Sequence, residues 1–267
     1  ENVPKLMGQL NDLIAPVLAG KVGLPQILAP RTPFNVTITS ERSYAARSVS
    51  LGDAKAIAKS TGTKLNDVVM AATSGALRSY LLKRQQLPDA SLVAFVPISL
   101  REAGNAEATN QVFGMNCPLA TNYGDPLKRL HKIKQESGTS KTLAGSVKDS
   151  APTDYTLIGA PALLPGLMQL YGMTRLADVV PQTVNLTISN TQGPPFPLYC
   201  AGAKVTALYP VSIATHGVAL NVTVQSYLDH LDFGVTADAA ALPDADVFAE
   251  AIVSSFEELK KAAAKAA

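Results

Sequence analysis

Residues 65–81, with the sequence LNDVVMAATSGALRSYL, contain the pattern on which the interpretation of the whole chain depends. The apolar side chains recur at helical spacing and form a wide stripe, and Thr63 lies where an N-cap is expected. Several residues in the stretch are small enough to let another element approach closely: Ala71, Ala72, Gly75 and Ala76. The pattern predicts a buried helix over residues 65–84 that packs tightly against a neighbour.

On both sides of this helix, apolar runs alternate with helical patterns. Apolar and β-branched runs predict strands at residues 35–39, 44–51, 92–98, 111–120, 184–189, 204–209, 219–226 and 230–235. Helical spacing predicts further helices at residues 51–60, 125–134 and 245–261, and residues 138–153 form a polar, mobile segment. Strands and helices mixed in this order predict an α/β (α+β) domain with a mixed sheet flanked by helices.

The N-terminal residues form a separate unit. Apolar residues between Leu6 and Leu18 predict a helix that ends near Gly20, and a proline-rich loop follows at residues 23–33. We therefore divide the chain into an N-terminal helix and linker, residues 1–29, and a domain formed by residues 30–267. Because the chain begins with Glu1, we expect a fragment or a processed product.

The composition excludes several classes of function. Of the 267 residues, 47% are hydrophobic and only 16% are charged, which allows a large core and extra apolar surface. The net charge of +2 and the absence of Trp argue against a nucleic-acid partner. The two cysteines form no metal or redox motif, and neither a P-loop, a GxGxxG, a GxSxG nor an HExxH motif is present. We expect no metal and no bound cofactor.

Residues 155–173 form an uncharged apolar stretch that is long enough to cross a membrane. Pro161 and Pro165 interrupt it, and proline breaks the helical hydrogen bonding that lipid demands. Two short buried helices are the favoured interpretation, while a lipid-facing or channel-lining element and a true membrane span remain open.

The residues that could carry chemistry form no complete catalytic set. His131 is expected on the solvated basic face of a helix with Lys128, Arg129, Lys132 and Lys134, His230 in a surface turn, and His216 in a structural position. Asn66 and Asp67 lie at the start of the helix described above, where an acidic side chain is favoured by the helix dipole. A buried carboxylate that holds a neighbouring loop or an arginine is the alternative.

Several segments, taken together and in order, resemble the wax ester synthase/diacylglycerol acyltransferase family. The matching segments are residues 30–35 (PRTPFN), 65–71 (LNDVVMA), 96–101 (VPISLR), 185–190 (NLTISN) with Gly193 and Pro194, 209–212 (YPVS), and 219–227 (ALNVTVQSY). Asp232, Phe233 and Gly234 resemble a DFG-type structural segment of related acyltransferases. The resemblance covers nearly the whole chain from Pro30 onward.

The resemblance implies one lobe of a two-lobed, chloramphenicol acetyltransferase-like fold in which acyl-CoA and an alcohol meet in a channel. The family's base is the second histidine of HHxxxDG, a motif that these residues lack. It implies that this motif belongs to a missing N-terminal half, which would be the chain's partner, and that the chain alone is inactive. Acyl-CoA is then a substrate, the acceptor is a fatty alcohol or diacylglycerol, and the location is cytoplasmic, with peripheral contact to the inner membrane or to lipid inclusions.

The resemblance also suggests roles for particular residues. No catalytic residue is expected in this chain, although Ser226, and not Thr223 on the opposite face of the same strand, is a candidate donor to the oxyanion. Asn66, Asp67 and Arg101 are expected to maintain the architecture near the active site. The expected channel residues are Ser189, Asn190, Gly193, Pro194, Leu164 and Leu167.

Two other functions remain open at this point. A chain of the same fold could serve as a non-catalytic lipid-binding or scaffolding module, or as a condensation-type enzyme that takes its acyl group from a carrier-protein thioester. An upstream HHxxxDG motif would argue against the first, and acyl transfer from CoA without a carrier would argue against the second.

Overall fold

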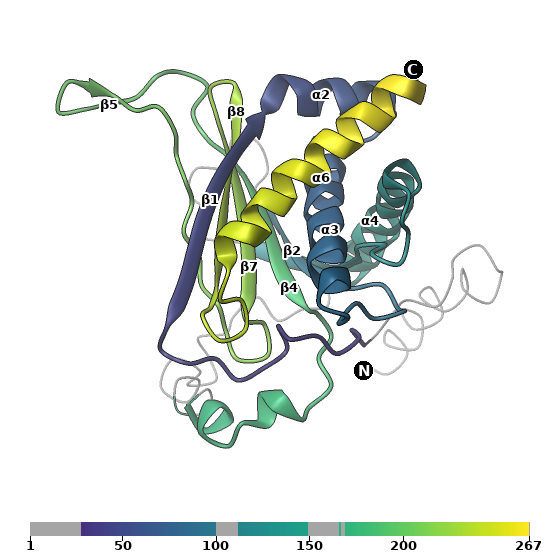
Figure 1. Ribbon diagram of the computed structural model, residues 1–267, viewed down its shortest axis with the longest axis vertical. Helices are drawn as coiled ribbons and strands as arrows, with labels where there is room; N and C mark the ends of the chain where they lie inside the picture. The colour runs from purple at the N-terminus through teal and green to yellow at the C-terminus, as the bar shows by residue number, and fades with distance from the viewer. Residues whose placement is uncertain (1–27, 100–111, 149–165, 167–168, 267) are drawn as a thin grey trace, which may run out of the picture.

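The computed structural model describes residues 28–99, 112–148, 166 and 169–266, and their strands form a mixed sheet (Figure 1). In the described residues its order is β1-β8-β7-β4-β2-β3. The strands are β1 (Arg42–Ser50), β2 (Val93–Ser99), β3 (Val112–Pro118), β4 (Leu186–Gln192), β7 (Leu220–Tyr227) and β8 (His230–Asp238). Strands β2, β4 and β7 are mutually parallel, and the remaining pairs are antiparallel. The predicted mixed sheet flanked by helices is confirmed.

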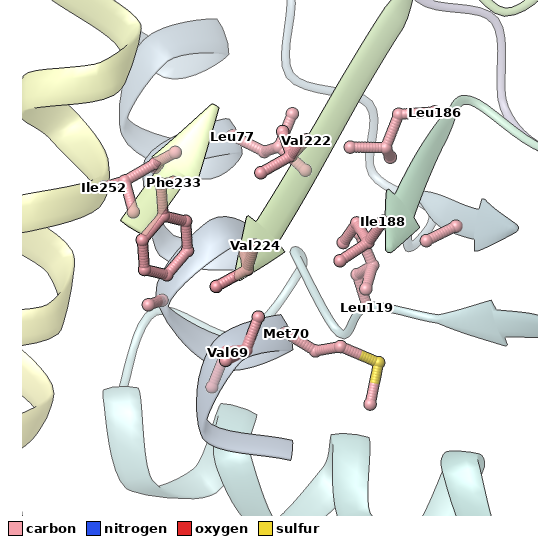
Figure 2. Packing of buried hydrophobic residues seen from close by; sticks show 14 of the residues in the cluster. Val69, Met70, Leu77, Leu119, Leu186, Ile188, Val222, Val224, Phe233 and Ile252 are labelled. Carbon is pink, nitrogen blue, oxygen red and sulfur yellow. The ribbon is translucent and has the colours of Figure 1, made fainter. Parts of the chain in front are cut away.

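Helices cover one face of this sheet (Figure 1). They are α2 (Leu51–Ser60), α3 (Leu65–Lys83), α4 (Pro126–Lys148) and α6 (Ala245–Ala266). Alternate strand residues such as Val222, Val224 and Phe233 point at the helices, where Val69 of α3 and Ile252 of α6 meet them (Figure 2). The small residues predicted to allow close packing are buried in α3, which packs directly against α6.

Helix α3 begins at Leu65 as predicted, but its N-cap lies one residue later than predicted. The N-cap is Lys64 and not Thr63, because the Asp67 carboxylate accepts a hydrogen bond from the Lys64 backbone N–H at 2.9 Å. The Asp67 side chain, three residues after the N-cap, therefore accepts the Lys64 N–H at the N-terminus of the helix, as the second half of a capping box does.

The strand predicted at residues 35–39 is wrong. Side chains, and not a neighbouring strand, accept the backbone N–H groups: Thr37 donates to Asp178 at 2.6 Å and Thr39 donates to Asp238 at 2.6 Å. Asp178 ends the short 3₁₀ helix η2 (Leu176–Asp178), and Asp238 ends β8. These long-range acceptors give the segment an extended backbone without a ladder partner.

The strand predicted at residues 204–209 is also wrong. Pairing is limited to a small hairpin of β5 (Tyr199–Cys200) and β6 (Ala203–Lys204). Residues 205–213, which we call the strap, then cross the face of β8 opposite helices α2, α3, α4 and α6. The Leu208 N–H donates to the Asp232 carboxylate at 2.8 Å, and the Ser212 N–H donates to the Thr236 hydroxyl at 3.4 Å. Side chains of β8 therefore hold the strap.

Helix α4 differs from prediction in two ways. It continues through residue 138 to Lys148, so at least residues 138–148 are helical and not a polar mobile segment. Arg129, predicted on a solvated face, is only 2% exposed and donates to the carbonyls of Tyr123 and Gly124. Burial lowers the pKa of this guanidinium. The charge pattern alone could not reveal that carbonyl oxygens of the preceding loop would turn Arg129 inward.

Most of the apolar stretch at residues 155–173 lies outside the described residues. Residues 169–173 are helical, and Leu170 and Met173 are exposed, which is contrary to burial of this end of the stretch. In the part of the chain that the structure describes, no helix combines the length and apolar character needed to cross a membrane.

Candidate functional site

The carboxyl ends of β2, β4 and β7 meet at one edge of the sheet because the three strands are parallel. Helix α3 runs against them, so its first turn lies at the same edge. The Asn190 side-chain amide at the end of β4 is 3.5 Å from the Asn66 side-chain oxygen in that turn. Ligands of open α/β sheets bind outside the carboxyl ends of parallel strands. This edge is therefore the candidate site.

Asp67 connects two helices beneath this edge. It is 3% exposed; one carboxylate oxygen accepts from the Lys64 N–H, and the other accepts from the Ser137 hydroxyl of α4 at 2.9 Å. With both oxygens occupied, the carboxylate fixes the start of α3 against α4. Asn66, one residue earlier, remains half-buried and faces the strand end.

Ser226 and Gly193 are in direct contact where β4 and β7 stop pairing. The Gly193 N–H donates to the Ser226 hydroxyl at 3.2 Å. A Cβ on residue 193 would lie 2.1 Å from the Ser226 carbonyl oxygen, so only glycine fits between the two strands. Since Ser226 Oγ accepts this bond, its own proton is available for another acceptor. Thr223 instead donates to the Asn221 side chain at 2.9 Å.

Tyr227 is a residue of this edge that sequence reasoning did not single out. Its side chain is fully buried, and its hydroxyl accepts from the Leu198 N–H at 2.9 Å and donates to the Val205 carbonyl at 3.0 Å. One phenol thus ties together both legs of the β5–β6 hairpin, which projects from the body (Figure 1). A tyrosine directly after the polar Ser226 at the end of an apolar strand was the available signal.

The other predicted site residues are placed as follows. Ser189 lies on β4 opposite Thr223, and Pro194 follows Gly193 where the chain leaves the sheet. Arg101, Leu164 and Leu167 lie outside the described residues. The division at residues 29 and 30 stays a prediction.

The histidines belong to separate parts of the molecule. The His131 ring lies 2.9 Å from the Leu127 carbonyl oxygen on α4. His230 begins β8 beside the carboxyl end of β7, as the register partner of Tyr227, and its ring contacts the exposed Asp229. His216 accepts a hydrogen bond from the Ile38 N–H. The described side chains that meet at the candidate edge, those of Asn66, Asn190 and Ser226, supply amides and hydroxyls, which orient and donate hydrogen bonds.

Two family models match the chain. The WS/DGAT C-terminal domain matches residues 108–260, and the wax ester synthase/diacylglycerol acyltransferase catalytic domain matches residues 1–69. A curated relative, O-acyltransferase WSD from Acinetobacter baylyi, is 39% identical over 80% of this chain and 45% of its own length.

Solved structures agree in fold. The wax ester synthase/diacylglycerol acyltransferase from Marinobacter aquaeolei superposes with a TM-score of 0.69 at 31% identity, over 95% of this chain and 56% of that protein. A condensation domain of the enacyloxin polyketide synthase shares the fold at 14% identity, with a TM-score of 0.55 over 94% of this chain and 46% of that one. The chain thus spans about half the length of the relatives that it matches, and it belongs to the wax ester synthase/diacylglycerol acyltransferase family.

Proposed function

We propose that this chain is the C-terminal half of a bacterial O-acyltransferase that moves a long acyl chain from acyl-CoA to a fatty alcohol or diacylglycerol. The observation that carries the proposal is the similarity to O-acyltransferase WSD at 39% identity over 80% of the chain. The name of the Marinobacter relative, wax ester synthase/diacylglycerol acyltransferase, supports both acceptors.

In the proposed reaction, a histidine of HHxxxDG in the preceding half takes the proton of the acceptor hydroxyl. The alkoxide oxygen attacks the thioester carbonyl, the C–S bond breaks, and the CoA thiolate takes up the proton. Ser226 donates a hydrogen bond to the oxyanion, because its oxygen already accepts from Gly193 and its proton is free. Asn66, Asp67 and Arg101 support the architecture, and Ser189, Asn190, Gly193 and Pro194 border the channel.

The apolar path of the substrates follows from the same proposal. Leu164 and Leu167, in the stretch at residues 155–173, line or flank the acyl or alcohol path, since a long acyl chain needs an apolar tunnel. Leu170 and Met173, at the end of the same stretch, are exposed. They support peripheral contact of a cytoplasmic enzyme with the inner membrane or lipid inclusions. A Leu164→Trp or Leu167→Trp variant shifts the preference toward shorter acyl chains, and an unchanged chain-length profile contradicts this assignment.

The test is ester formation by the full-length protein from long-chain acyl-CoA with hexadecanol or diacylglycerol. We expect activity with CoA thioesters, a loss of activity when the second histidine of HHxxxDG is replaced, and no activity from the chain alone. Ser226→Ala lowers kcat by about 100- to 1000-fold, whereas Thr223→Ala, the control on the same strand, changes it little. Full activity in Ser226→Ala contradicts the oxyanion role. An absence of transfer from CoA contradicts the whole proposal and favours a lipid-binding module or a carrier-dependent enzyme.

A further inference from the structure

Three consecutive backbone N–H groups donate to side chains from three distant parts of the chain. The pairs are Thr37 with Asp178 at 2.6 Å, Ile38 with His216 Nδ1 at 3.2 Å, and Thr39 with Asp238 at 2.6 Å. We call these three bonds the clasp. It joins the segment that enters the domain to the helical segment at residues 169–178, the turn at residues 214–218 and the end of β8.

The His216 ring is held in a fixed position inside the clasp. It is half-buried and lies against Gly172 so closely that a Cβ there would be 2.5 Å from Nε2. The Tyr171 ring meets it edge-on with 6.4 Å between the ring centroids, and the Tyr171 hydroxyl accepts from the Gln182 amide at 3.1 Å. The imidazole therefore has little freedom to turn away from Ile38.

The hydrogen bond from Ile38 fixes the protonation state of this ring. Nδ1 accepts a hydrogen bond only in neutral imidazole, whose proton is then on Nε2. When the ring gains a second proton, Nδ1–H faces the Ile38 N–H, and two donors meet. We propose that the clasp contains a pH-sensitive latch: neutral His216 accepts the Ile38 N–H and joins residues 37–39 to the turn at residues 214–218, and protonated His216 breaks this bond.

Each of the two clasp carboxylates has an arginine beside it. Arg175 pairs with Asp178 at 2.7 Å, and Arg42, next to Glu41, approaches Asp238 at 3.7 Å. The bond from the Thr37 N–H, followed by that from Arg175, lowers the pKa of Asp178. Burial alone would raise the pKa of Asp238, but the bonds from Thr39 and from the backbone of Ala241 and Ala240 lower it. Both carboxylates therefore remain charged in the range, between about pH 5 and 8, where an imidazole changes charge.

Release would affect two functional segments at once. One is the chain entering at residues 28–40, and the other is the end of the apolar stretch at residues 155–173. The latch does not rest on the proposed acyl transfer, because its test needs no activity measurement.

The test is amide hydrogen exchange in the full-length protein at pH 8 and pH 5.5, expressed as protection factors corrected for the intrinsic effect of pH. We expect protection of the Ile38 amide to fall by about tenfold at pH 5.5, the equivalent of one lost hydrogen bond. Thr37 and Thr39, whose carboxylate acceptors stay charged, should lose less protection, and residues 222–224 in β7 should change little. In His216→Asn, an amide oxygen near the position of Nδ1 accepts from Ile38 at both pH values, so protection becomes independent of pH. His131→Asn, a variant on exposed α4 surface, retains the wild-type response.

Two outcomes would overturn the latch. One is equal protection of the Ile38 amide in the wild-type protein at the two pH values. The other is an unchanged pH response in His216→Asn, which would assign the titration to another group. Gly172→Ala serves as a second variant, since its Cβ displaces the ring and should reduce protection already at pH 8.

Discussion

The two faces of strand β8 are covered in different ways. Leu231, Phe233 and Val235 point into the layer of helices and are buried. On the opposite face, Asp232 and Thr236 hold the strap through hydrogen bonds to its backbone. Apolar side chains of the strap are nevertheless exposed: Tyr209 is 48% exposed, Val211 72% and Ile213 74%.

The difference between the faces shows which face of the sheet this chain buries with its own helices and which face keeps exposed apolar side chains. Burial of apolar area stabilises the helix-covered face. Polar bonds fix the path of the strap on the other face and leave a row of apolar side chains uncovered. Such a row is expected where another part of a protein packs, and the chain spans only about half the length of its relatives.

The largest expected contrast between the two kinds of region concerns the two cysteines. Burial, followed by the charges of Glu136 and Asp67, raises the pKa of the Cys117 thiol to about 12, whereas Cys200 is exposed in the hairpin. At pH 8 only on the order of 1 in 10,000 Cys117 side chains is a thiolate. Iodoacetamide followed by peptide mass spectrometry should therefore label Cys200 rapidly and Cys117 only after unfolding. Equal labelling of both in the folded protein would show that β3 is not covered.

Removal of a large core side chain should have the largest effect on stability. Phe233→Ala leaves a cavity beneath the helices and lowers the free energy of unfolding by about 3–5 kcal/mol. Phe196→Ala, at a position 59% exposed, should change it by less than about 0.5 kcal/mol. Urea unfolding followed by circular dichroism measures both. Similar losses in the two variants would mean that the exposed region is also packed.

The polar face should respond locally and by a smaller amount. Asp232 is fully buried and accepts from the Leu208 N–H and the Ser48 hydroxyl. Asp232→Ala leaves the Leu208 N–H without its acceptor and costs about 1–3 kcal/mol, whereas the Ser48 hydroxyl keeps the Tyr209 hydroxyl as a partner at 3.2 Å. Limited proteolysis should then cut within residues 205–213, which it spares in Asp229→Ala, a substitution of an exposed neighbour. An intact strap in Asp232→Ala would show that other contacts suffice to hold it.

Loss of the Tyr227 hydroxyl should have the smallest effect. Tyr227→Phe keeps the buried ring and removes two hydrogen bonds to the hairpin legs, at a cost of about 1 kcal/mol. Hydrogen exchange at Leu198 should rise, while exchange in β8 stays unchanged. Tyr199→Phe, in the exposed part of the hairpin, is the matched control. If Leu198 exchanges at the same rate in both variants, the Tyr227 hydroxyl does not anchor the hairpin.

Periodicity and composition predicted the parts of the fold that depend on local pattern. Helices α2, α3 and α6 and strands β2, β3, β4, β7 and β8 follow from apolar spacing, because that spacing decides which side chains can be buried. Residues 35–39 were wrongly predicted as a strand because the acceptors of their N–H groups, such as Asp238, are about 200 positions away in the chain. The burial of Arg129 was not predicted because its acceptors are backbone carbonyl oxygens, which every residue has and which the sequence therefore cannot single out.

For the candidate site too, local pattern identified individual residues, while long-range pairing decides how they meet. Asn66, Asn190, Gly193 and Ser226 were selected as separate motif residues, and parallel pairing brings them to one edge of the sheet. Pairing partners of strands far apart in sequence cannot be read from periodicity. Tyr227 was missed because a buried aromatic residue at the end of a strand looks like ordinary core.

Both legs of the β5–β6 hairpin are fastened to one phenol, and its tip at Ala201 and Gly202 is exposed with positive φ angles. The hairpin is therefore a short arm that is attached at its base to the Tyr227 hydroxyl. A fluorescent dye attached to Cys200 would move with this arm. Low anisotropy of the dye would show that the arm moves freely, and high anisotropy would show that it contacts another part of the full-length protein.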